Sequence, residues 1–156
     1  MTIQDFDKKF KDIADQMPDF LDDLAPRIAG NVAEEHIKAN FLKQGFEGTP
    51  WKEVQRRIPG SKAYRANARR HPARLTRPIL TGDTGDLGRS INVSYSKGQA
   101  TIFSDKIYAK VHNEGLRAGR GKGFIMPQRQ FLGPSEALEQ DIKQQIKEQF
   151  QRLFNI

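Results

Sequence analysis

The sequence contains no cysteine, and this absence excludes three kinds of chemistry. Disulfide bonds, zinc sites built on thiolates and a cysteine nucleophile are all ruled out, and the composition fits a protein made in the cytoplasm. No apolar run reaches the roughly 18 residues of a membrane-spanning helix, so we expect no membrane contact. Residues 1–7 lack the basic start and apolar stretch of a signal peptide, so we expect no secretion signal.

Sequence signs of catalysis are also scarce. The three histidines lie far apart, without an HExxH motif or another metal-binding spacing; they are His36, His71 and His112. No GxSxG motif supplies a serine nucleophile. The segment 82–88 superficially suggests a phosphate-binding loop but lacks its lysine. Within it, Asp83 and Asp86 are either paired carboxylates for a metal or turn residues that bond their own backbone. We expect no catalytic residues, no cofactor, no metal site and no small-molecule substrate.

Positive charge is concentrated in one segment of the chain. Residues 1–50 carry six basic and ten acidic side chains, a net of −4, whereas residues 51–80 carry nine basic and one acidic, a net of +8. Such a segment attracts polyanions, including DNA, and equally attracts an acidic protein surface. The candidate contacts are Arg56, Arg57, Lys62, Arg65, Arg69, Arg70, Arg74 and Arg77. Since no recognition helix or zinc finger is visible, any DNA contact would be to the backbone phosphates.

Apolar residues at helical spacing predict helices in the first 45 residues. One face of the first helix consists of Ile3, Phe6, Phe10, Ile13 and Met17. Pro18 should end or kink this helix, or else open a second one at its first position. A stripe over residues 28–41 predicts a further helix that ends near Gly45. His36 lies on that stripe, and we interpret it as a buried, hydrogen-bonded histidine in preference to a metal ligand.

The middle of the chain changes character. Residues 45–80 lose periodicity and are punctuated by glycine and proline, so we expect a long basic loop, with a short helix over the arginines of residues 65–77 as an alternative. The alternation over residues 91–95, followed by turn residues, predicts a β-hairpin that ends at Phe103. Residues 107–112 fit either a helix or a strand. Four glycines and three basic residues in the segment 115–123 predict a mobile cationic tip.

The C-terminal segment predicts one more helix, which opens at residues 133–136. Its buried stripe consists of Leu138, Ile142, Ile146, Phe150 and Phe154. These elements predict an α+β fold with N-terminal helices, a small antiparallel β-sheet with a long basic loop, and a C-terminal helix packed on the sheet. The 156 residues are enough for a single domain. Its parts would be a helical region at 1–45, a basic loop at 46–80, and a core of sheet and C-terminal helix at 81–156.

Four motifs occur in an order that resembles phage virion morphogenesis and tail completion proteins, the Mu-like G protein family. They are Gly48-Thr49-Pro50-Trp51, the run from Pro78 to Ile91 with Thr84-Gly85-Asp86-Leu87, Tyr108-Ala109-Lys110-Val111-His112-Asn113-Glu114-Gly115, and Met126-Pro127-Gln128-Arg129-Gln130-Phe131-Leu132-Gly133. The resemblance covers roughly residues 40–156. The motif residues that we take as candidate assembly positions are Trp51, Thr84, Gly85, Leu87, Ser90, Ile91, Tyr108, Ala109, His112, Gly115, Pro127, Arg129, Phe131, Leu132 and Gly133.

The resemblance implies a structural role in the tail or neck of a virion, after synthesis in the bacterial cytoplasm. It further implies tail completion or head–tail joining by a ring of identical subunits, with a hexamer expected, in contact with other tail or neck proteins. Trp51 would either pin the basic segment onto the core or stack on a partner, and we favour the first. Arg129 would brace a carboxylate within the chain or on a neighbouring subunit. The alternative is a DNA-binding protein that uses residues 51–80 as a basic arm without sequence specificity.

Overall fold

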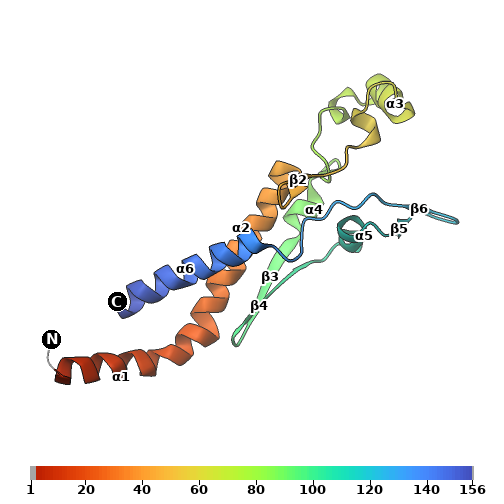
Figure 1. Ribbon diagram of the computed structural model, residues 1–156. Helices are drawn as coiled ribbons and strands as arrows, with labels where there is room; N and C mark the ends of the chain where they lie inside the picture. The colour runs from red at the N-terminus through yellow and green to blue at the C-terminus, as the bar shows by residue number, and fades with distance from the viewer. Residues whose placement is uncertain (1–2, 156) are drawn as a thin grey trace. The chain divides into compact units, whose positions relative to one another are not determined.

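The structure is a computed structural model that describes residues 3–155, with the side chains of Ile3 and Phe6 outside the description. It confirms a mixed α and β fold with N-terminal helices, small antiparallel sheets and a C-terminal helix (Figure 1). The chain forms two compact units. Unit 1 comprises residues 1–35, 92–103 and 135–156, and unit 2 comprises residues 36–91 and 104–134. The expectation of one domain stays a prediction.

The N-terminal helices run on from one another with a widened turn between them. Helix α1 spans Ile3–Asp19, the π-helix η1 spans Phe20–Leu24, and α2 spans Ala25–Lys43. In the widened turn, the Ala25 N–H donates to the Phe20 carbonyl, five residues back. A proline ring crowds the carbonyl four residues before it, so the wider turn makes room for Pro26. Helix α1 continues one residue past Pro18, and the helix axis changes direction between α1 and α2 (Figure 1).

Aromatic rings join the two ends of the chain within unit 1. The C-terminal helix α6 spans Glu136–Phe154 and begins at the N-cap Ser135, whose hydroxyl accepts a hydrogen bond from the Leu138 N–H. Its apolar stripe is half-buried to buried, as the spacing predicts. Phe20 is buried and meets Phe150 and Phe154 edge-on, with ring centroids 5.3 and 6.1 Å away.

The predicted hairpin is present, and its strands lie next to the N-terminal helices. Strand β3 spans Ile91–Ser96 and β4 spans Gln99–Ser104, so two residues join them. At the turn, Gly98 has a positive φ of 69° and its N–H donates to the Asp22 carbonyl over 2.8 Å. A Cβ at Gly30 would lie 2.7 Å from the Tyr95 ring, so a side chain at that helix position has no room. The hairpin is thereby fixed against η1 and α2.

The segment predicted as a long basic loop contains short elements instead. Strands β1 (Gly45–Phe46) and β2 (Thr49–Pro50) pair antiparallel, and the short helices are η2 (Gln55–Arg57), α3 (Lys62–Arg70) and η3 (Pro72–Arg74). The expectation of a loop throughout is therefore wrong, and the alternative of a short helix is correct for α3. Three of the nine residues in α3 are alanine, the strongest helix former, and Ser61 caps its start.

The rest of unit 2 is built from short helices and one small hairpin. Helix α4 spans Asp86–Arg89 and α5 spans Ala109–Glu114. Of the two alternatives for residues 107–112, helix or strand, the helix is therefore correct from Ala109 onward. The glycine-rich tip lies between two short antiparallel strands, β5 (Arg117–Ala118) and β6 (Phe124–Ile125). Across residues 3–155 the strands thus form three two-stranded sheets, not one sheet. None of the helices in this described range is long and apolar enough to cross a membrane.

Candidate assembly surface

Three aromatic residues form the centre of unit 2. Phe41 on α2 packs against Trp51 and Phe131, with ring centroids 5.6 and 5.0 Å away. Trp51 is only 7% exposed, and its indole Nε1 donates to the Gln130 carbonyl. The Asn40 amide donates to the Phe131 carbonyl over 3.2 Å. Trp51 therefore fixes the start of the basic segment to the core, where its ring is not available to a partner.

The side chain of Asn113 joins α5 to the segment that carries the last motif. Its Oδ1 accepts hydrogen bonds from the N–H groups of Phe131 and Leu132 at 2.9 and 3.0 Å, and its Nδ2 donates to the Leu132 carbonyl. The Arg129 N–H donates to the His112 carbonyl over 2.8 Å. Gly115 ends α5 with a positive φ of 71°, which allows the chain to reverse there. Two separate motifs are thus held side by side.

Most of the candidate assembly residues lie inside unit 2. The buried ones are Trp51, Leu87, Ser90, Ile91, Ala109, Arg129 and Phe131. The half-buried ones are Gly85, His112, Gly115, Pro127, Leu132 and Gly133, and the exposed ones are Thr84 and Tyr108. Burial at so many motif positions indicates that the motifs first of all specify the core of this unit.

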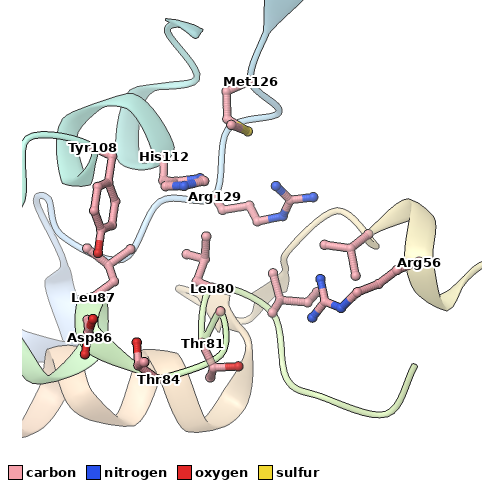
Figure 2. A pocket seen from close by; sticks show the side chains of 13 residues that line it. Arg56, Leu80, Thr81, Thr84, Asp86, Leu87, Tyr108, His112, Met126 and Arg129 are labelled. Atoms are coloured by element: carbon pink, nitrogen blue, oxygen red, sulfur yellow. The ribbon is translucent and has the colours of Figure 1, made fainter. Parts of the chain in front are cut away.

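The structure brings three of the four motifs together around one pocket, which we call the motif pocket (Figure 2). It has a volume of about 400 Å³. Its lining residues are Val54, Arg56, Ile79, Leu80, Thr81, Gly82, Thr84, Asp86, Leu87, Tyr108, His112, Met126 and Arg129. Tyr108, which is 40% exposed, meets the His112 ring edge-on with centroids 6.2 Å apart. The motif pocket combines apolar side chains with two guanidinium groups.

Burial and like charge act on the ionisable groups of the motif pocket. Burial, followed by the positive charge of Arg56, lowers the pKa of Arg129, while the charge of Glu53 acts in the opposite direction. The Arg129 Nε donates to the Lys52 carbonyl over 3.0 Å, where the sequence had suggested a carboxylate partner. Burial and the charge of Arg129 lower the pKa of His112. The hydrogen bond from Thr84 is the main reason that the pKa of Asp86 is lowered.

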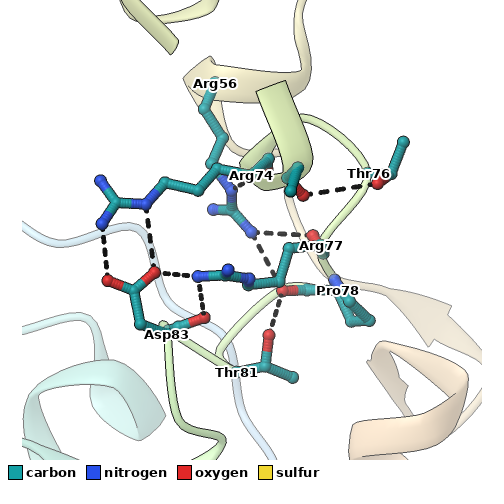
Figure 3. Close-up of polar contacts among 9 residues, drawn as sticks. Arg56, Arg74, Thr76, Arg77, Pro78, Thr81 and Asp83 are labelled. Carbon is teal, nitrogen blue, oxygen red and sulfur yellow. Dashed lines mark hydrogen bonds and ion pairs between the residues drawn. The ribbon is translucent and has the colours of Figure 1, made fainter. Parts of the chain in front are cut away.

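Four arginines of the basic segment are engaged within unit 2, and Figure 3 shows three of them, Arg56, Arg74 and Arg77. Arg56 donates to the carbonyls of Arg74, Arg77 and Pro78 at 2.9, 2.9 and 3.0 Å. Arg74 and Arg77 both pair with the carboxylate of Asp83. Burial, followed by the charges of Arg57 and Arg77, lowers the pKa of Arg56. We call Arg56, Arg74, Arg77 and Asp83 the arginine cluster. Arg57 donates to the Gln44 Oε1 over 3.0 Å.

The remaining candidate contacts are on α3. Lys62, Arg65, Arg69 and Arg70 are all exposed. The eight basic residues of the sequence prediction therefore separate into four that brace the fold and four that face solvent. Among residues 3–155, no group of three or more histidine, aspartate or glutamate side chains is arranged to hold a metal ion. Asp83 pairs with arginines and Asp86 lies 3.1 Å from Arg89, so the two carboxylates have separate partners.

Comparison with known families decides the affiliation of the chain. Residues 1–151 match the phage virion morphogenesis family. The chain belongs to this family. Its sequence is also similar to the Mu-like prophage FluMu G protein 2 of Haemophilus influenzae (strain ATCC 51907 / DSM 11121 / KW20 / Rd), with 37% identity over 71 residues. That match covers 46% of this chain and 51% of the relative, so the chain spans about half the length of the curated relative that it matches. No solved structure matches the chain.

Membership in the phage virion morphogenesis family gives the protein a role in phage morphogenesis. The match begins at residue 1, so the N-terminal helices lie inside the family region. The sequence motifs had placed the start of the resemblance near residue 40. That boundary was wrong because amphipathic helices carry an apolar spacing without fixed residue identities, which a search for short motifs does not detect.

Sequence reasoning missed two polar residues that hold this family member together. The Gln44 Oε1 accepts hydrogen bonds from the Ile79 N–H and from Arg57. Asn113 lies within the third motif but was not selected. A signal was present at Gln44, because it directly follows the last residue of a helix that the periodicity predicts. For Asn113 the signal was its place beside His112 in the motif.

Proposed function

We propose that this family member is a structural protein of the virion neck or tail that completes the tail or joins it to the head. In this proposal identical subunits form a ring, with a hexamer expected, that contacts other tail or neck proteins and catalyses no reaction. The protein is made in the host cytoplasm and becomes part of the virion. The observation that carries the proposal is the match of residues 1–151 to the phage virion morphogenesis family, together with a pocket on this chain that combines cationic and apolar groups. This arrangement suits the recognition of another protein.

The experiment is a deletion of the gene in an inducible phage or prophage, followed by electron microscopy of the particles. We expect DNA-filled heads and separate tails, with normal particles restored by the gene supplied in trans. Light scattering and cryo-electron microscopy of the purified protein then measure the ring. Normal particles from the deletion strain would refute a role in joining. A free monomer at all concentrations, with no ring in the virion, would refute the ring.

A second function is favoured by the exposed side chains of α3. Lys62, Arg65, Arg69 and Arg70 are available to phosphates, and such contacts bind DNA without sequence specificity and with strong salt dependence. Gel-shift measurements with a short duplex in rising salt test this function. Tight binding by the monomer at physiological salt, lost when the four residues are changed to glutamine, would favour DNA binding over the structural role.

A further inference from the structure

The motif pocket contains a buried cation whose hydrogen-bonding capacity is only partly used. Arg129 is 6% exposed, and its Nε is taken by the Lys52 carbonyl. Its two terminal nitrogens find no acceptor among the described residues. The nearby Nδ1 of His112 is buried and also lacks a hydrogen-bond partner within residues 3–155. Buried polar groups are normally satisfied, so the unpartnered Nδ1 of His112, together with the free terminal nitrogens of Arg129, marks the pocket as a place where a ligand would be bound.

The charge around Arg129 selects an anion. Arg56 and Arg129 both line the pocket, and the positive charge of Arg56 contributes to lowering the pKa of Arg129. Removing a cation from water is costly unless an opposite charge is supplied. A carboxylate accepts two parallel hydrogen bonds from a guanidinium, which matches the two unused nitrogens of Arg129.

The other walls of the motif pocket select an apolar neighbour for that anion. Ile79 and Leu87 are buried there, and Leu80 and Met126 add further carbon surface. Asp86 also lines the pocket, and its carboxylate would repel an acid. Figure 2 shows Asp86 beside Thr84, on the opposite side of the view from Arg56, so the favourable place for an anion is the arginine side. A volume of about 400 Å³ accommodates one or two side chains.

We propose that the motif pocket binds an acidic peptide segment of a protein partner, with its carboxylate on Arg129, near the positive charge of Arg56, and an adjacent apolar side chain against Leu80, Leu87 and Met126. This inference rests on the proposed function, because it describes how the protein contacts a neighbour in the virion. A DNA duplex fits less well. Its phosphates lie on the outside of a stiff rod, which enters a pocket less readily than a flexible peptide does, and Arg129 is only 6% exposed.

The test is a titration of the full-length, isotope-labelled protein, followed by NMR. The probes are the peptide acetyl-Leu-Glu-Leu-amide and its matched control acetyl-Leu-Gln-Leu-amide. We expect saturable shifts at residues 80, 87, 112, 126 and 129 with the glutamate peptide, and at least about tenfold weaker binding of the glutamine peptide. Equal affinity for both peptides, or no saturation below about 10 mM, would overturn the proposal.

Two variants and one further ligand sharpen the result. Asp86→Asn removes the repelling charge from an exposed side chain, so it should bind the glutamate peptide roughly threefold more tightly. Arg129→Gln should abolish the preference for glutamate, and the Asp86 variant keeps the test valid if the Arg129 variant does not fold. A short DNA duplex should leave the pocket signals unchanged. If the duplex shifts the pocket signals and the peptide does not, the ligand of the pocket is DNA and the proposal of a peptide is refuted.

Failure of this inference and failure of the proposed function give different observations. Separate heads and tails from the deletion strain, together with no discrimination between the peptides, would leave the structural role in place and remove the pocket assignment. Normal particles from that strain, together with glutamate-selective binding, would refute the structural role and keep the assignment of the pocket as a peptide site.

Discussion

In unit 2, single polar side chains form hydrogen bonds with backbone groups that neighbouring strands would satisfy in a larger sheet. The strands β1, β2, β5 and β6 have two residues each, so few backbone groups pair with one another. Asn40, Gln44 and Asn113 instead bond the backbone of segments that are distant in the sequence. Each such side chain satisfies groups that would otherwise be buried without a partner.

Asn113→Ala should strongly destabilise the fold. The substitution removes three hydrogen bonds and leaves backbone groups of Phe131 and Leu132 unsatisfied in a part-buried position. We expect a loss of about 2–4 kcal/mol in the free energy of unfolding, measured by urea denaturation. Gln145→Ala, at an exposed position of α6, is the control and should change stability by less than about 0.5 kcal/mol. Equal losses for the two variants would contradict this role of Asn113.

Stability should fall as the pH is lowered from 7 toward 5.5, in part because of His112. Burial, followed by the charge of Arg129, depresses its folded-state pKa below the ordinary value of 6.5. The unfolded chain therefore binds a proton that the folded protein rejects, so stability is present above pH 6.5 and decreases below it. One such group contributes at most about 1.4 kcal/mol per pH unit.

The measurement is urea denaturation of the wild type and of His112→Gln across this pH range. The variant should lose less stability on acidification than the wild type. His71→Gln, a change at an exposed histidine, should keep the wild-type slope. An unchanged slope in the His112 variant would show that this imidazole does not carry the effect.

At the scale of elements, the sequence predicts those that carry their own pattern. Helix α6 is predicted because apolar residues recur every four positions from Leu138 to Phe154 and Ser135 supplies the cap. The hairpin β3–β4 is predicted from alternation and turn residues. Helix α3 is obscured because Pro59, Gly60 and Pro72 bracket it closely, so the segment reads as a loop.

The motif pocket lies beyond such prediction. Its walls come from residues near 80–87, 108–112 and 126–129, which only tertiary contacts bring together. The partner of Arg129 illustrates the difficulty, because the Lys52 carbonyl is 77 residues away in sequence. A backbone carbonyl has no residue type, so no sequence pattern points to it. The sequence identifies Arg129 as a position of interest, whereas its contacts require the fold.

Ser61→Ala should loosen α3 without unfolding the rest of the protein. The Ser61 hydroxyl accepts a hydrogen bond from the Tyr64 N–H and donates one to the Gln55 carbonyl. Loss of an N-cap costs about 1 kcal/mol. Hydrogen exchange of the amides in residues 65–70 should accelerate roughly fivefold, with little change at α6. Ser61→Thr retains both the capping oxygen and the hydroxyl proton and should remain close to the wild type; faster exchange in both variants would contradict capping by Ser61.

At the scale of the whole molecule, charge is distributed unevenly and partly neutralised by contacts. The net charge is +7, yet the three arginines of the arginine cluster are bonded to backbone carbonyls or to the carboxylate of Asp83. The four exposed basic residues of α3 therefore contribute more to the positive electrostatic potential at the surface than the paired arginines do. Affinity for polyanions should respond to both sets of residues.

Asp83→Asn should strengthen non-specific DNA binding. The change removes the shared counter-ion of Arg74 and Arg77, so two guanidinium groups gain freedom to meet phosphates. We expect a roughly threefold to tenfold tighter Kd for a short duplex at low salt, measured by fluorescence anisotropy, and a smaller difference at high salt. Asp105→Asn makes the same charge change at another exposed site and should have less effect. Equal gains from both variants would assign the effect to net charge alone.

The contacts between residues 40–52 and 129–131 also determine when the core of unit 2 can fold during synthesis of the chain. Asn40, Trp51 and the Lys52 carbonyl all wait for partners that the ribosome adds much later. Until residues 130 and 131 are made, the Trp51 indole lacks its hydrogen-bond acceptor and the Phe41 ring lacks its contact with Phe131. The apolar rings of the nascent chain can then bind chaperones or associate with other chains. A message that stops before codon 129 should consequently yield a protease-sensitive product, whereas the released full-length chain should contain a protease-resistant core.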